Sequence, residues 1–113
     1  PVAGPVGLGA AAAIKERGNA YLIGVDSDWF LTSPEYGDIT LTSVMKLMDA
    51  TTMQVIKSVI DGTFVGGDVV GTLANNGVTI APFHDLAGLV PAELAAEIDQ
   101  LRADIIAGKI TLD

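Results

Sequence analysis

Three charged side chains, Asp26, Asp28 and Lys46, stand where apolar runs of the sequence end. Asp26 and Asp28 follow the run "LIGV", and Lys46 closes the stretch "ITLTSVMK". Because parallel α/β sheets bind ligands at the carboxyl ends of their strands, acids and a base at these points indicate a site for a polar small molecule. Asp26 could accept hydrogen bonds from two neighbouring hydroxyls of a sugar, and Asp28 could share that role or cap a turn.

The side chains next to these acids have two interpretations each. Lys46 is expected in the first turn of a helix, where a cation opposes the helix dipole. A carboxylate partner such as Asp26, or a ligand hydroxyl, would offset that cost, and a solvated surface lysine is the alternative. Trp29 and Phe30 could stack on a flat ring or serve as packing anchors.

The glycines of "AGPVGLG", at Gly4, Gly7 and Gly9, match neither the dinucleotide fingerprint nor a phosphate loop. A glycine-rich turn before a helix would let backbone N–H groups approach a ligand, and the alternative is a tight turn packed on the sheet. His84 has no second histidine or helical partner for a metal site, so a structural role is expected. We expect no cofactor, and no nucleophile motif supports hydrolysis.

The bulk composition bounds the class of protein. The chain of 113 residues, 50% of them hydrophobic, can form one domain. Its formal charge is −8 and its six bases are scattered singly, which disfavours nucleic-acid binding. The absence of cysteine excludes disulfides and thiolate metal sites. The opening "PVAG" reads as the tail of a strand with hardly any strand before it, so we expect a piece of a longer chain.

The local patterns predict alternating strands and helices. After the "PVAG" strand we expect a helix from Val6 to Arg17, a buried strand at 20–26 and a long loop at 27–38. A strand at 39–43 should lead into a helix from Val44 to about Asp61. Residues 64–82 read as a hairpin turning at 75–77, and residues 91–107 as an amphipathic helix. No boundary is visible inside 1–113, which we read as a single unit.

Several stretches, taken in order, resemble the C-terminal portion of the basic membrane protein family. These are the lipoprotein-type substrate-binding proteins of ABC transporters that include purine nucleoside receptors. The similarity covers nearly all of the chain. The stretches that carry it are "GPVGLGAAAAIKERG", "YLIGVDSDW", "ITLTSVMK", "VIKSVIDGTFVGG", "NGVTIAPFHDL" and "VPAELAAEIDQLRADIIAGKI".

The resemblance implies a type 1 periplasmic-binding-protein fold, in which two α/β lobes close around a ligand. This chain would hold most of the C-terminal lobe, a mostly parallel sheet flanked by helices, and would lack the N-terminal lobe. The family's glycine, aspartate and lysine on the ribose side fall on Gly4, Asp26 and Lys46. Asp28 and Trp29 are possible further ligand residues, and Trp29 stands where the family commonly has glutamine.

The resemblance also implies a binding protein and no enzyme. It would work outside the cytoplasm, held to the membrane by a lipid anchor outside this sequence, and deliver a nucleoside to an ABC permease by lobe closure.

Three alternatives to a transport function stay open: a receiver domain, a sugar-processing enzyme and a fragment that binds no ligand. A phosphoacceptor receiver needs an acid pair that "PVAG" lacks and a proline where Leu47 follows Lys46. A sugar-processing enzyme needs a base or nucleophile with an orienting partner. A fragment with half a pocket could bind nothing, and its exposed face would favour a dimer.

Overall fold

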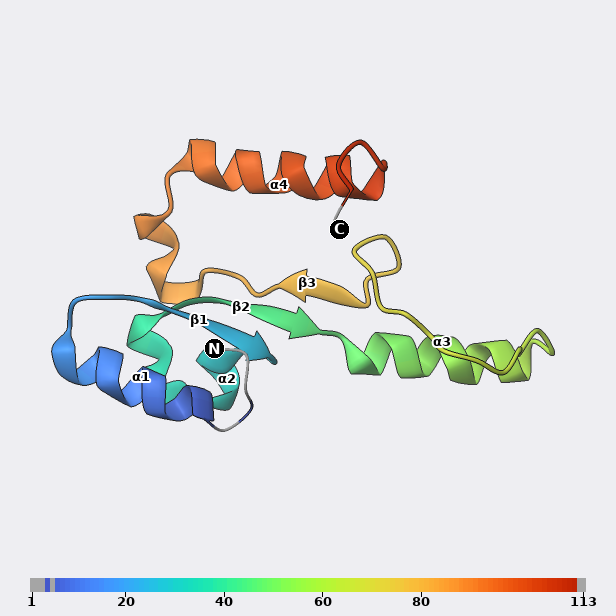
Figure 1. Ribbon diagram of the computed structural model, residues 1–113, viewed down its shortest axis with the longest axis horizontal. Helices are drawn as coiled ribbons and strands as arrows, with labels where there is room; N and C mark the ends of the chain where they lie inside the picture. The colour runs from blue at the N-terminus through green and yellow to red at the C-terminus, as the bar shows by residue number, and fades with distance from the viewer. Residues whose placement is uncertain (1–3, 5, 112–113) are drawn as a thin grey trace.

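The computed structural model describes residue 4 and residues 6–111. Four α-helices, two 3-10 helices and three strands follow one another in this part of the chain (Figure 1). In order they are α1 (Val6–Arg17), β1 (Leu22–Asp26), α2 (Trp29–Thr32), η1 (Pro34–Ile39), β2 (Thr40–Lys46), α3 (Met48–Ile60), β3 (Val78–Ile80), η2 (His84–Leu89) and α4 (Ala92–Ile106). The strand predicted in "PVAG" falls, apart from Gly4, outside the described residues.

The strands form one mixed sheet in the order β1-β2-β3. β1 and β2 are parallel, with Asp26 opposite Met45, whereas β3 runs antiparallel to β2. In Figure 1, α1 and α2 lie on one side of the sheet and α4 on the other. The predicted α/β class is therefore confirmed, and the carboxyl ends of β1 and β2 meet at one edge.

The helix predicted from Val6 to Arg17 is present as α1. Lys15 and Arg17 lie in its last turn, where cations are favoured, and Gly18 follows with a φ of 64°. Its Ala11 is fully buried and belongs to the same apolar cluster as Leu22 of β1. The buried residues of α1, Gly7 and Ala11, are small, so the helix can lie close to the sheet.

The prediction of a long loop at 27–38 is wrong, because these residues fold into α2 and η1. Asp28 caps α2 by accepting a hydrogen bond from the N–H of Phe30, and Pro34 stands at the start of η1. A side-chain cap and a proline with fixed φ can begin short helices that show no apolar period. The polar, turn-rich composition of this segment therefore gave no signal for these two short helices.

The predicted start of the next helix, at Val44, is also wrong. β2 continues through Lys46, and α3 begins only at Met48. Val44, Met45 and Lys46 pair with three residues of β3, so tertiary strand pairing overrides the helical spacing of the apolar residues. Lys46 is consequently the last residue of a strand.

The hairpin predicted within 64–82 does not form, because only its second half is a strand, β3. The Oδ1 atom of Asn75 accepts hydrogen bonds from the N–H groups of Thr72 and Gly77, and its amide donates to the Val70 carbonyl. These bonds close a compact loop. β3 therefore pairs with β2 instead of with residues 64–70.

The final helix, α4, lies within the span predicted as helical and is followed by Gly108, whose φ is 70°. Hydrogen bonds from Lys109 and Gln100 hold the pKa of Asp104 below its usual range. None of the helices in the described residues has the length and apolar character needed to cross a membrane.

One close approach fixes β1 against its neighbours. A Cβ atom added at Gly24 would overlap Ser43 Oγ and lie 2.7 Å from Trp29 Cγ. Ser43 is fully buried, and its Oγ accepts a 3.1 Å hydrogen bond from the backbone N–H of Trp29. β1, β2 and α2 thus meet at a point that has no room for a side chain.

We expect Gly24→Ala to lower the free energy of unfolding by about 1–3 kcal/mol, because the added methyl group overpacks this contact. Gly9→Ala is the matched control, since Gly9 lies inside α1 with nothing within 4 Å of an added Cβ. That change should stabilise the protein by about 0.5–1 kcal/mol. Urea denaturation measures both, and equal effects would contradict the close contact.

Candidate functional site

The carboxyl ends of β1 and β2 bring Asp26 and Lys46 together. Lys46 Nζ lies 2.7 Å from Asp26 Oδ1, and the two side chains are 63% and 48% exposed. The pairing that the sequence suggested for Lys46 is therefore present, although Lys46 reaches it from a strand end. The pair stays open to solvent and hence to a ligand.

Asp26 has an unusual backbone conformation. Its φ is 70°, and the N–H of Ser27 donates a 2.9 Å hydrogen bond to the carbonyl of Val25. A bond that spans two residues around a positive φ defines a γ-turn of the rare, strained form. Strain of this kind at a non-glycine residue clusters at functional sites.

The two carboxylate oxygens of Asp26 differ in surroundings. Oδ1 is buried and has no well-directed hydrogen bond among the described groups, so its contact with Lys46 is an ion pair without good donor geometry. The exposure of the side chain therefore belongs to the rest of the group, including Oδ2. An ionised Oδ2 can accept hydrogen bonds from a ligand.

A cavity of about 340 Å³ opens beside Asp26. It brings together three residues that the sequence singled out, Gly4, Asp26 and Trp29. Its other lining residues are Leu8, Val25, Ser27, Thr32 and Ser33. Lys46 instead lines a second cavity, of about 260 Å³. The Asp26–Lys46 ion pair therefore has one residue in each cavity.

Gly4 lies in the turn that precedes α1. Its φ is 50°, and its carbonyl accepts a 3.1 Å hydrogen bond from the N–H of Gly7. An added Cβ atom at Gly4 would meet nothing within 4 Å, as at several other glycines, so a ligand role for Gly4 stays a prediction.

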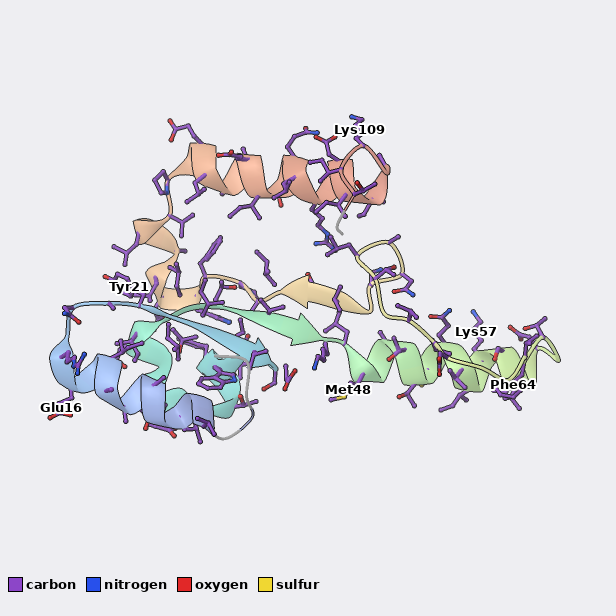
Figure 2. The ribbon with its side chains drawn as sticks, in the orientation of Figure 1. Glu16, Tyr21, Met48, Lys57, Phe64 and Lys109 are labelled. Carbon is purple, nitrogen blue, oxygen red and sulfur yellow. The ribbon has the colours of Figure 1, made fainter. Side chains whose placement is uncertain are left out.

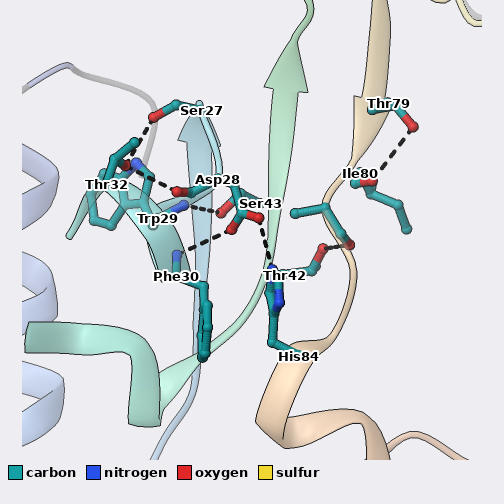
Figure 3. A network of polar contacts seen from close by, with 11 residues as sticks. Ser27, Asp28, Trp29, Phe30, Thr32, Thr42, Ser43, Thr79, Ile80 and His84 are labelled. Carbon is teal, nitrogen blue, oxygen red and sulfur yellow. Dashed lines mark hydrogen bonds and ion pairs between the residues drawn. The ribbon is translucent and has the colours of Figure 1, made fainter. Parts of the chain in front are cut away.

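Asp28 is held by internal contacts (Figure 3). It is 8% exposed, its Oδ1 accepts from the Phe30 N–H at 3.1 Å, and its Oδ2 lies 2.7 Å from His84 Nε2. The sequence left open whether Asp28 caps a turn or binds a ligand, and in the structure Asp28 caps α2. A ligand role for Asp28 stays a prediction that these contacts do not favour.

His84 connects α2 to the start of η2. Its ring stacks on Phe30 with centroids 4.1 Å apart and an interplanar angle of 9°, while its Nε2 meets Asp28. The structural role expected for His84 agrees with these contacts. In the described part of the chain, no three His, Cys, Asp or Glu side chains gather as a metal site.

Trp29 is mainly a packing anchor. It is 6% exposed, belongs to the core cluster with Ala11 and Leu22, and donates from Nε1 to the Val25 carbonyl at 2.9 Å. It also lines the cavity, so its ring is both wall and core. The sequence reading missed the hydroxyl residues Ser27 and Thr32, because it placed them in a loop.

The strain at Asp26 predicts an order of stability among its variants. Asp26→Gly and Asp26→Ala both remove the ion pair, but only glycine adopts the positive φ at little cost. We therefore expect Asp26→Gly to be more stable than Asp26→Ala by about 1 kcal/mol in urea denaturation. Equal unfolding free energies would show that the turn relaxes and stores no strain.

Comparison with known proteins finds a family model and solved structures that match this chain. The family model Bmp, described as "ABC transporter substrate-binding protein PnrA-like", matches residues 1–112. A crystal structure of a transcriptional activator of the comK gene from Bacillus halodurans superposes with a TM-score of 0.74 at 22% identity. That match covers 91% of this chain and 34% of the other, so the chain spans about a third of that protein's length. Curated proteins give no match.

Proposed function

The chain belongs to the Bmp family of PnrA-like ABC transporter substrate-binding proteins, and on this premise we propose that it binds a purine nucleoside or similar ribose-containing solute for uptake. The family's role is solute binding, so the proposal contains no bond chemistry. The single observation that carries the choice of ligand is the solvent-open Asp26–Lys46 pair beside a cavity.

The chemistry of this pair suits a sugar. The open oxygen of Asp26 can accept from a ribose hydroxyl, and the Lys46 ammonium can donate to a ribose oxygen. Charge-assisted hydrogen bonds of this kind become strong and directional once water is excluded. The backbone of Gly4, which lines the same cavity as Asp26, would supply the third ligand contact.

On the same premise we propose that the protein works outside the cytoplasm, with an ABC permease as its partner. We propose that a lipid anchor outside this sequence holds it at the membrane, and that closure around the ligand is the signal read by the permease. The receiver-domain alternative is not favoured by the family match.

The chain exposes more surface than a compact protein of its mass. Its accessible area is 7717 Å² for 11.6 kDa, whereas folded monomers of that mass expose about 5,800 Å². Its radius of gyration is 16.7 Å, against about 13 Å for a compact domain. Roughly 1,900 Å² of surface is therefore in excess, which is the scale of a large interface.

Much of this surface lies on one projecting arm, made of α3 and the segment 61–72 (Figure 1; Figure 2). No α3 side chain counts among the buried residues of the described chain. The exposed apolar side chains of the arm are Met48, Met53, Ile56, Val59, Ile60, Phe64, Val65, Val69 and Val70. We propose that the arm packs on an N-terminal lobe outside residues 1–113, as the greater length of the matched crystal structure suggests.

The ligand proposal predicts binding by the full-length protein that contains these residues. Isothermal titration with guanosine, inosine, adenosine and ribose should show nucleoside binding that Asp26→Ala weakens by roughly 2 kcal/mol, about 30-fold. Asp38→Ala is the matched control, because Asp38 pairs with Lys15 at 2.9 Å on an exposed surface away from the cavity. It should leave the affinity unchanged.

If none of these compounds binds, the nucleoside proposal is wrong, although the family membership stands. Equal losses in Asp26→Ala and Asp38→Ala would mean that net charge, and not the site, controls binding.

The arm proposal predicts that the 113-residue chain alone self-associates, including as a dimer, because its apolar arm has no cover. Sedimentation equilibrium should give a mass that rises with concentration, and Ile56→Lys should reduce it. Leu31→Lys is the control, since Leu31 is 67% exposed but lies on α2. A wild-type chain that stays monomeric at high concentration would count against an uncovered arm.

A further inference from the structure

The hydroxyl groups of Ser27 and Thr32 contact each other (Figure 3). Ser27 Oγ lies 3.1 Å from Thr32 Oγ1, and Thr32 Oγ1 donates a 3.0 Å hydrogen bond to the Asp28 carbonyl. Both residues line the cavity beside Asp26. A threonine hydroxyl has one proton, and here the carbonyl takes it.

The direction of the first hydrogen bond follows from this proton count. Because the Thr32 proton points at the carbonyl, the bond between the hydroxyls forms only if Ser27 donates to Thr32. The Ser27 proton is then used, and its Oγ has only lone pairs left to offer. Its neighbour Asp26, when ionised, also only accepts.

We propose that Ser27 determines specificity in this cavity. Asp26 accepts a hydrogen bond from one hydroxyl of the ligand, and Ser27 accepts a hydrogen bond from the adjacent hydroxyl. This inference rests on the proposed function and names the feature that the site selects: two adjacent hydrogen-bond donors. The hydroxyl pair is exposed in this chain. Once the proposed closure around the ligand excludes water, a ligand with a lone-pair atom at one of these positions faces an acceptor there, and the unpaired polar groups weaken its binding.

The test compares a ribonucleoside with analogues in which fluorine replaces the 2′- or the 3′-hydroxyl, since fluorine is small and cannot donate. The full-length wild-type protein should prefer the ribonucleoside at both positions. Ser27→Ala should weaken ribonucleoside binding about 5- to 10-fold and shrink the preference at one of the two positions. Ser58→Ala is the matched control, because the Ser58 hydroxyl bonds the Val55 carbonyl within α3.

Thr32→Val tests the direction of the hydrogen bond between the two hydroxyls. Without the Thr32 hydroxyl, the Ser27 proton is free to point into the cavity, so Ser27 can donate. The preference for hydroxyl over fluorine should then fall at the same position that Ser27→Ala affects, while the affinity for the fluorinated analogue rises. Urea denaturation of each variant shows whether it is folded.

The outcomes separate this inference from the proposed function. A wild-type protein that binds ribonucleosides, with Ser27→Ala unchanged in affinity and preference, overturns the role of Ser27 and leaves the function standing. A wild-type protein that binds no nucleoside overturns both. An unchanged preference in folded Thr32→Val overturns the acceptor assignment.

Discussion

The parallel contact between β1 and β2 is the constraint on which the site depends. It is close because Gly24 has no side chain, which lets buried Ser43 hold the backbone of Trp29. That bond positions the start of α2, and the turn at Asp26 lies between the strand and the helix. The same pairing places the end of β2 beside Asp26. One missing methyl group thus permits the arrangement of every charged group at the sheet edge.

The aspartates separated by one residue show how neighbouring residues of the same type receive different roles. Asp28 is buried and has a partner for each oxygen, His84 among them, so its charge is used inside the fold. Asp26 is half exposed on a strained turn, and it forms an ion pair with Lys46, which is itself exposed. Burial and satisfied hydrogen bonds separate a cap from a group that is available to a ligand.

Sequence reasoning succeeded where the signal is local and failed where it depends on tertiary pairing. The apolar run before Asp26 is short and bounded by turn residues, and the stretch of α1 is rich in helix-forming alanine, so the strand end and the helix follow from local signals. Lys46 was named as a partner of Asp26 but was placed in a helix, because pairing with β3 cannot be read from the apolar spacing of residues 44–60. The cap at Asp28 was weighed, whereas its tie to His84, 56 residues away, left no local pattern.

The junction between β2 and α3 has a mechanical consequence. A single residue, Leu47, separates Lys46 from the arm, and its N–H is fixed to the Gly77 carbonyl at 2.9 Å. α3 has 13 residues and is therefore about 20 Å long. A rotation of about 10° at Leu47 would displace the far tip of the helix by roughly 3 Å. The strand end that carries Lys46 is thus the short side of a lever, and the helix is its long side.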